Sequence, residues 1–300
     1  MLRISPQDIE THELHQWLLG SIGPRPIAFA STLDDNGTPN LAPFSFFNVF
    51  SANPPILIFS PARRVRDNTT KHTLENVLKT KEVVINVVNY SIVEQMSLAS
   101  TEYPLGTNEF HKSGLTAIPS ELVAPFRVKE SPVQLECKVN DVIALGNAGG
   151  AGNLVICEVV LMHINPNILS DDGKIDPFKI DLVSRMGGDW YCRAQGDSLF
   201  EVEKPIRKLG MGVDALPKSI RESYILSGND LGKLGNTEAL PSSIEVEEFL
   251  NHQRIQAILS SSSDGLERRE QLHEYAKELL TKNKVQKAWK ALMCDLINRN

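Results

Sequence analysis

Hydrophobic and polar residues follow a strand-like pattern over the first two hundred residues. Short apolar runs there are bounded by Gly, Pro, Asn and Asp, which is typical of strands joined by tight turns. The predicted strands cover residues 27–33, 40–50, 56–60, 82–88, 133–145 and 154–164. Asn36 and Gly37 separate the first two strands and supply the positive φ that a tight hairpin requires. We therefore predict an antiparallel, mainly β structure for this part.

Helical spacing of apolar residues dominates the end of the chain. The predicted helices there cover residues 243–259, 265–282 and 284–298. Ser242 and Glu245 form a capping box at the start of the first of these helices.

Shorter helices are expected within the β-rich part. They cover residues 9–19, 74–80 and 91–100, and Ser91 with Glu94 predicts a capping box in the last one. The segment after Pro205 alternates short apolar stretches with Gly and Pro, which predicts a surface arm or linker. The expected organisation is a β domain over residues 1–204, and a linker or arm with a helical C-terminal extension over residues 205–300.

Charge and composition narrow the classes of function. A formal net charge of -6 and a pI near 5.7 argue against a general nucleic-acid binder, because such proteins attract phosphates with a basic field. The sequence contains no apolar run near the roughly 20 residues that span a bilayer. The N-terminal segment lacks the pattern of a signal peptide. We expect a cytoplasmic protein without a membrane or nucleic-acid partner.

The four cysteines indicate neither a disulfide framework nor a metal site. Cys137, Cys157, Cys192 and Cys294 are far apart and form no C-x-x-C pair. We predict reduced thiols and no bound metal.

The glycine-rich segment at residues 146–152 superficially resembles a phosphate loop. It lacks the Gly-Lys-Ser/Thr ending of a P-loop, and no helical pattern follows it. We interpret it as a flexible hairpin connection between two long strands.

A basic, hydroxyl-rich loop is the first candidate for ligand chemistry. Residues 63–73 end where a helix is predicted to start, and free backbone N–H groups at such an end favour an anion. Lys71 and Thr73 could add a charge and a hydroxyl to a phosphate site. The alternative is a solvated basic loop in which Thr73 simply caps the helix.

The segment from Pro43 to Asn48 is the second candidate, as a slot for a flat ring. Ser45 and Asn48 could offer side-chain hydrogen bonds, while Phe46 and Phe47 could wall the slot. An ordinary sheet with buried phenylalanines is the alternative. Arg25, between two prolines, could meet a phosphate, an acid or another subunit, or it could be a plain surface arginine.

These segments, taken in order, resemble the flavin reductase-like family with the FMN-binding split barrel. The resemblance covers roughly residues 15 to 200. It rests on Pro24-Arg25-Pro26-Ile27-Ala28, Ser31-Thr32, residues 40–48, Pro54-Pro55, Lys71-His72-Thr73-Leu74-Glu75-Asn76, Glu158-Val159, His163, and residues 185–191. It implies a mainly β, Greek-key-like split barrel with short helices.

The resemblance also implies a cofactor, a co-substrate and partners. Members of this family usually dimerise with FMN near the interface, and many use NADH or NADPH to reduce flavin for a partner monooxygenase. Carried onto this chain, Ser45, Phe46, Phe47 and Asn48 would line the flavin. The candidate cofactor-binding residues also include Arg25, Ser31, Thr32, Lys71, Thr73 and Arg185.

His163 is the candidate catalytic residue, because the resemblance would place it near the nicotinamide. A structural histidine at a sheet edge is the alternative. The chain departs from the family by having His72 where Asp is common, and by a longer arginine-bearing loop before it.

The predicted function is therefore an FMN-dependent oxidoreductase that transfers hydride from NAD(P)H to flavin and passes electrons to an acceptor or partner oxygenase. Two alternatives stay open: a flavin-bound electron carrier or enzyme without NAD(P)H reductase activity, and a non-enzymatic flavin-binding module. The sequence does not distinguish NADH from NADPH.

Overall fold

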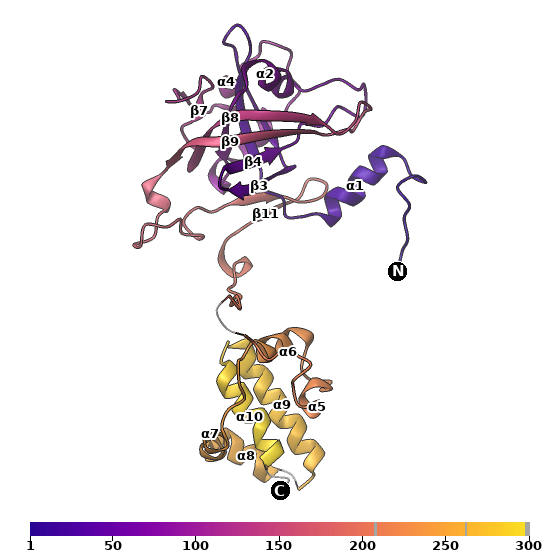
Figure 1. Cartoon of the computed structure of the whole chain (residues 1–300), viewed down its shortest axis with the longest axis vertical. Helices are drawn as coiled ribbons and strands as arrows, with labels where there is room; N and C mark the ends of the chain where they lie inside the picture. The colour runs from indigo at the N-terminus through magenta and orange to yellow at the C-terminus, as the bar shows by residue number, and fades with distance from the viewer. Residues whose placement is uncertain (207–208, 262, 298–300) are drawn as a thin grey trace. The chain divides into compact units, whose positions relative to one another are not determined.

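The chain forms two compact units in the computed structural model, Met1–Phe200 and Glu201–Asn300 (Figure 1). The structure describes residues 1–206, 209–261 and 263–297. The first unit is built on β-strands and the second on helices.

An antiparallel seven-stranded sheet is the framework of the first unit. Its strands follow the order β2-β1-β5-β8-β9-β4-β3 across the sheet. The strands are β1 (Ala28–Leu33), β2 (Pro39–Phe44), β3 (Phe47–Ala52), β4 (Pro55–Phe59), β5 (Glu82–Val87), β8 (Val133–Ala144) and β9 (Asn153–Ile164). Figure 1 shows the two long strands, β8 and β9, lying side by side across the unit.

The sheet curls around an apolar core. Phe44 from β2 and Phe59 from β4 lie near opposite edges of the sheet, yet their rings lie 5.5 Å apart. Ala28, Ile85, Cys137 and further buried side chains from the intervening strands join the same cluster. This closure buries the apolar runs from which the strands were predicted. The predicted mainly β, split-barrel fold is confirmed.

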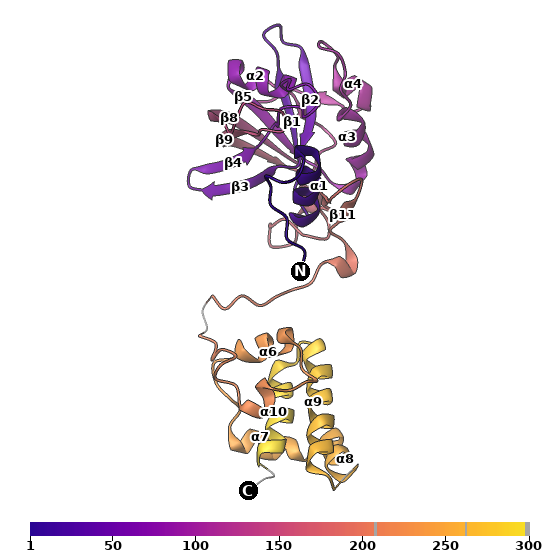
Figure 2. The ribbon, with the colours of Figure 1, turned by 90° about the vertical axis from the view of Figure 1, so that its right-hand side faces the viewer.

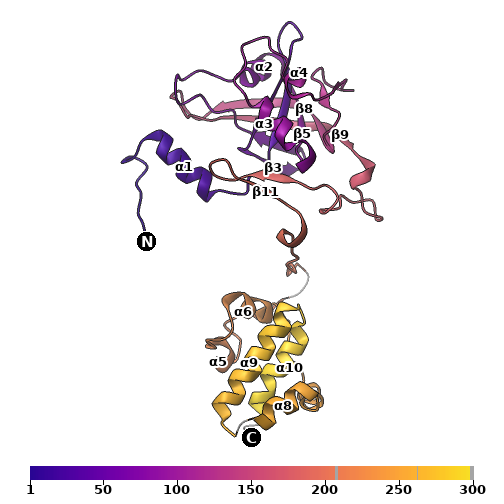
Figure 3. The same ribbon diagram turned by 180° about the vertical axis from the view of Figure 1, so that it is seen from behind.

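Short helices and ribbons complete the first unit. The helices are α1 (Thr11–Ser21), α2 (His72–Thr80), α3 (Val93–Ala99) and α4 (Glu109–Ser113), and the short strands are β6 (Ala117–Ile118), β7 (Arg127–Val128), β10 (Val183–Arg185) and β11 (Tyr191–Arg193). Figures 2 and 3 show α3 and α4 against the outer side of the sheet. A second apolar cluster there joins Phe29 and Leu41 of the sheet to Met96 and Phe110 of these helices.

Two local predictions for this unit were wrong. The strand predicted over residues 40–50 is two strands, because β2 pairs with β1 whereas β3 pairs with β4, and the chain changes partners at Ser45 and Phe46. The capping box of Ser91 is absent from the described structure, since the Ser91 hydroxyl donates to Asn89 and α3 begins at Val93 after a 3-10 turn.

Helices pack around Trp289 in the second unit. They are α5 (Lys218–Arg221), α6 (Gly228–Gly235), α7 (Ser243–Leu250), α8 (Gln253–Ser261), α9 (Gly265–Thr281) and α10 (Val285–Ile297). Trp289 is fully buried, and its indole Nε1 donates to Thr237 Oγ1 at 2.9 Å. The predicted capping box of Ser242 and Glu245 at the start of α7 is confirmed.

The second unit also corrects two expectations. The helix predicted over residues 243–259 breaks after Leu250 into α7 and α8. The segment predicted as a surface arm or linker buries Leu216, Ile220 and Leu234 in the helical core, so it belongs to that core. Residues 207, 208 and 298 of the predicted segments lie outside the described residues.

Candidate flavin site

Arg25 ties three segments together at the entrance to β1. Its Nη1 donates to the carbonyl of Leu19 at 2.7 Å and to that of Ile22, both at the end of α1, and its Nη2 donates to the carbonyl of Met186 at 2.8 Å. Its Nε lies 3.5 Å from Ser45 Oγ. Because Arg25 is buried and its guanidinium is engaged in these bonds, its geometry is that of a positioning residue.

Arg185 lies beside Arg25 through the backbone. The two residues form an antiparallel bridge, with N–H···O distances of 2.9 and 2.8 Å. The Arg185 guanidinium stacks over the Tyr191 ring at 4.6 Å. Burial and the charge of Arg185 lower the pKa of the Arg25 guanidinium. The structure thus brings together two segments that are far apart in the sequence, both of which carried the resemblance.

The segment that joins β2 to β3 presents both partly buried and exposed candidates. Phe47 packs against the barrel core, whereas Phe46 and Asn48 are exposed. Phe46 meets His15 of α1 edge to face, with ring centroids 6.1 Å apart. The carbonyl of Phe46 accepts a bond of 2.8 Å from Ser60 N, at the start of the basic loop. This contact joins the predicted ring segment to the predicted phosphate segment.

Thr32 of β1 and Thr73 of α2 are brought together where the helix packs on the sheet. Asn40 Nδ2 donates to Thr73 Oγ1 at 2.9 Å and to Thr32 Oγ1 at 3.2 Å, and Asn76 Nδ2 donates to Thr32 Oγ1 at 3.0 Å. Thr32, Thr73 and Asn76 are buried. These hydroxyls therefore fix α2 against the sheet. Asn40 and Asn76 were not among the predicted site residues, although both lie in the segments that carried the resemblance.

The N-terminus of α2 carries the basic groups of the candidate site. The helix begins at His72 with Lys71 as its N-cap residue, and no side chain caps it. Its first N–H groups therefore have no side-chain cap to satisfy them, and uncapped groups at a helix start favour an anion. Thr73 lies inside the helix, so the alternative in which Thr73 is a simple N-cap is wrong.

Three cations near this helix end converge on one carboxylate. Glu102 Oε1 accepts from Arg64 Nε at 2.9 Å and lies 3.6 Å from Lys71 Nζ, while Glu102 Oε2 accepts from Arg66 Nη2 at 3.0 Å. Hydrogen bonds from Arg64 and Arg66 hold the pKa of the Glu102 carboxyl below its usual value. The side chains of this cluster thus meet at a point that already accommodates an anionic group.

The glycine-rich connection packs against the basic loop. The backbones bond in both directions, from Arg63 N to Ala151 O at 2.8 Å and from Gly150 N to Arg63 O at 3.0 Å. A Cβ on Gly149 would lie 2.9 Å from the carbonyl oxygen of Val65. The prediction of a hairpin connection is correct, but these contacts make the connection a support for the basic loop, and only glycine allows so close an approach.

Ser31 lies apart from the other candidates. Side chains alternate along a strand, so Ser31 shares the face of Phe29 beneath α3 rather than that of Thr32. Its hydroxyl is buried and has no hydrogen-bond partner among the described residues.

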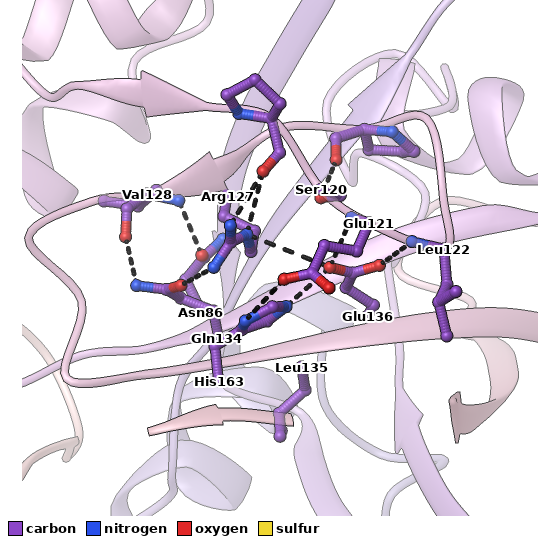
Figure 4. A network of polar contacts seen from close by, with 12 residues as sticks. Asn86, Ser120, Glu121, Leu122, Arg127, Val128, Gln134, Leu135, Glu136 and His163 are labelled. Atoms are coloured by element: carbon purple, nitrogen blue, oxygen red, sulfur yellow. Dashed lines mark hydrogen bonds and ion pairs between the residues drawn. The ribbon is translucent and has the colours of Figure 1, made fainter. Parts of the chain in front are cut away.

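His163 belongs to a separate polar network at the other end of β9 (Figure 4). Its Nε2 lies 2.7 Å from Glu136 Oε1, and Glu136 accepts from the backbone N–H groups of Glu121 at 2.9 Å and Leu122 at 2.6 Å. Val155 of β9 pairs with Phe59, next to the basic loop, and His163 lies eight residues further on, roughly 25 Å along the strand. Within one chain, His163 is therefore remote from Ser45.

Glu136 is the buried centre of this network. Burial acts to raise the pKa of its carboxyl, but the two backbone amides and His163 outweigh burial, so the pKa lies below its usual value. The network fixes residues 119–123 to the sheet, and Arg127 joins it through Gln134 at 3.0 Å.

The residues present fit a flavin mononucleotide. Arg64, Arg66 and Lys71 with the uncapped α2 end offer the donors that a phosphate needs. Asn40 lies near the start of the adjacent strand β2 and Ser45 directly follows its end, roughly 17 Å away, so the strand separates the basic groups from the ring segment. The described residues contain no group of three or more His, Cys, Asp or Glu side chains placed to hold a metal ion. No helix in the described ranges is long and apolar enough to cross a bilayer.

Comparison with known proteins identifies the family of the chain. Residues 20–177 match the family model described as the flavin reductase like domain. A protein of Aquifex aeolicus is 37% identical over 189 residues, which cover 63% of this chain and 94% of that protein.

Two solved structures are similar to the chain in both sequence and fold. Nitrilotriacetate monooxygenase component B from Bacillus cereus is 31% identical, with a TM-score of 0.63 over 67% of this chain and 98% of that one. A protein with a split barrel domain from Shewanella frigidimarina is 29% identical, with a TM-score of 0.57 over 68% of this chain and all of that one. The chain belongs to the flavin reductase-like family of flavin-related oxidoreductases, and its first unit is the split barrel of that family.

Proposed function

We propose that the protein binds FMN at the α2 end of the barrel, transfers hydride to it from NADH or NADPH, and passes the electrons to an acceptor or partner oxygenase. The observation that carries the proposal is the convergence of Arg64, Arg66 and Lys71 at the uncapped start of α2, in a chain of this family. The similarity to a monooxygenase component B supports an oxygenase partner.

The phosphate would be held by Lys71, Arg64 and Arg66, together with the first backbone N–H groups of α2. Thr73 would act from beneath, by holding the helix start in place through Asn40. The isoalloxazine ring would lie along Ser45, Phe46 and Asn48, of which Phe46 and Asn48 are exposed. FMN, when bound, supplies a ring that accepts a hydride and can release the electrons to a further acceptor.

The protein's own contribution to such a reaction is alignment and exclusion of water. Hydride transfer requires two rings held face to face, and correct orientation alone can supply a large part of the rate enhancement. Arg25 fixes Ser45 relative to α1 and Met186. We propose that Arg25 positions the ring segment and that His163 stabilises residues 119–123, so neither residue takes part in the hydride step.

We further propose that the protein acts as a homodimer in the cytoplasm. Support for the dimer comes from the exposed apolar side chains of β3 and α1. Val49 and Phe50 of β3 are each 63% exposed, Trp17 of α1 is 46% exposed, and Ile22 directly after α1 is 64% exposed. Large apolar side chains left exposed in this number are a feature of surfaces that bind another protein.

Binding of FMN and riboflavin to matched lysine variants tests the assignment of the phosphate site. Lys71→Met removes a cation at the start of α2, whereas Lys81→Met removes one at its end. We expect Lys71→Met to weaken FMN binding by about fivefold, with no change for riboflavin, and Lys81→Met to change neither. A protein that binds neither flavin, or a Lys71→Met variant that binds both as the native chain does, would contradict the assignment.

A further inference from the structure

A single acidic side chain occupies the point where the cations of the basic loop meet. Glu102 lies in the segment 100–108, between α3 and α4, and reaches across to Arg64, Arg66 and Lys71. Its carboxylate engages the donors that the proposed function gives to the flavin phosphate. Two anions cannot share these donors without repulsion, because like charges at this range oppose each other.

The other described contacts of this segment are local. The backbone bonds of the segment join Ser100 to Ser97, Thr101 to Leu98, Tyr103 to Thr101, Thr107 to Pro104 and Lys112 to Asn108. Leu105 at its tip is 73% exposed, and Tyr103 meets Lys112 of the neighbouring helix. Among the described residues, Glu102 is thus the group that fastens the segment to the basic loop.

The charge balance favours a phosphate over the carboxylate. Asp67 partly neutralises Arg66 at 3.2 Å, so three cations face two carboxylates in this cluster. A phosphate monoester carries about 1.5 to 2 negative charges near neutral pH and has three acceptor oxygens. A phosphate can therefore offer separate oxygens to Arg64 and Lys71. In Glu102, a single carboxylate oxygen, Oε1, faces both cations.

We propose that Glu102 competes with the flavin phosphate for the basic loop, so that phosphate binding releases segment 100–108 and the carboxylate sets how tightly FMN is retained. The inference rests on the proposed function for the identity of the phosphate. It makes Glu102 a determinant of selectivity between FMN and riboflavin, since riboflavin has no phosphate to displace the carboxylate.

Two variants of the full chain separate competition from a general effect of charge. Glu102→Gln keeps the size of the side chain and removes its charge. Glu94→Gln removes a charge from an exposed position on α3 and serves as the control. Binding of FMN and of riboflavin is measured by quenching of flavin fluorescence. We expect Glu102→Gln to tighten FMN binding about fivefold and to leave riboflavin unchanged, while Glu94→Gln changes neither.

Hydrogen exchange of segment 100–108 provides a readout without flavin. Inorganic phosphate should accelerate exchange of this segment in the native chain, whereas in Glu102→Gln the exchange should be fast with or without phosphate. Equal or weaker FMN binding by Glu102→Gln overturns the inference, as does exchange that phosphate leaves unchanged in the native chain. If phosphate accelerates exchange but no flavin binds, the competition by Glu102 stands and the proposed function fails.

Discussion

Replacement of Arg25 by methionine distinguishes a positioning role from a direct contact with the cofactor. Methionine keeps an unbranched side chain in the buried site but removes the guanidinium. The Arg25→Met variant loses the bonds to the carbonyls of Leu19, Ile22 and Met186, and the longer contact to Ser45. We expect the start of β1 and the end of α1 to open more readily, while the rest of the barrel persists.

The size of the effect follows from these bonds. A hydrogen bond from a charged donor contributes about 1.5 to 3 kcal/mol, less where water can replace the donor. Because α1 has no buried residues, water can reach its carbonyls once the guanidinium is gone. We therefore expect a loss of about 2 to 3 kcal/mol in the local free energy of opening, which corresponds to roughly 30- to 150-fold faster hydrogen exchange.

Hydrogen exchange resolved by peptide measures this effect in residues 11–33, without interference from the helical unit. Arg185→Met is the matched control, because Arg185 shares the backbone bridge but stacks its guanidinium on the Tyr191 ring. We expect that control to change exchange by less than about fivefold. Affinity for FMN and riboflavin should fall together in Arg25→Met. Unchanged exchange with a loss of FMN binding alone would refute the positioning role.

Three further variants test other parts of the account. Gly149→Ala should weaken FMN binding several-fold in a titration, because its Cβ would lie 2.9 Å from Val65 O and displace the basic loop, whereas Gly20→Ala, with nothing within 4 Å of its Cβ, should not. His163→Gln should leave the rate of hydride transfer within about twofold of the native rate and should accelerate hydrogen exchange of residues 119–123. A loss of rate with unchanged exchange would instead show that His163 takes part in the reaction. The pKa of the Glu136 carboxyl is lower in the folded chain than the usual value of about 4.3. The ionised carboxylate therefore stabilises the fold above about pH 4.3, and this stabilisation is lost as the pH falls through the lower pKa of the folded chain. Acid unfolding of the native barrel should therefore be steeper than that of Glu136→Gln, and equal acid dependence would contradict the role of Glu136.

The sequence predicts most strands of the barrel because strand formation here depends on local patterns. Apolar runs and the turn at Asn36 and Gly37 identify β1, β4, β5, β8 and β9 to within a few residues. The break at Ser45 has no local signal, since it arises where the chain leaves the β1 partner and joins β4. The helical unit shows the same limit, because Leu216 and Ile220 gain their burial from helices that follow much later in the chain.

The candidate site was predictable in its parts and not in its arrangement. From the sequence, the charged loop and the helix start were consistent with an anion site or with a solvated basic loop. Arg25 was a candidate cofactor-binding residue because its two proline neighbours hold it rigidly. In the structure its guanidinium instead donates to backbone carbonyls of α1 and Met186. Glu102 carried no signal at all, since it follows Arg64 by 38 positions and meets the basic loop only through the tertiary fold.

The most direct test of the central claim is an anaerobic titration of the FMN-loaded protein with NADH and, separately, with NADPH. The visible absorbance of oxidised flavin reports the transfer of hydride in each case. The account predicts rapid bleaching by one equivalent of at least one of the two nucleotides, and recovery of the absorbance when an electron acceptor is added. A protein that holds FMN through Lys71 but keeps its full absorbance with both nucleotides would contradict the proposed reductase.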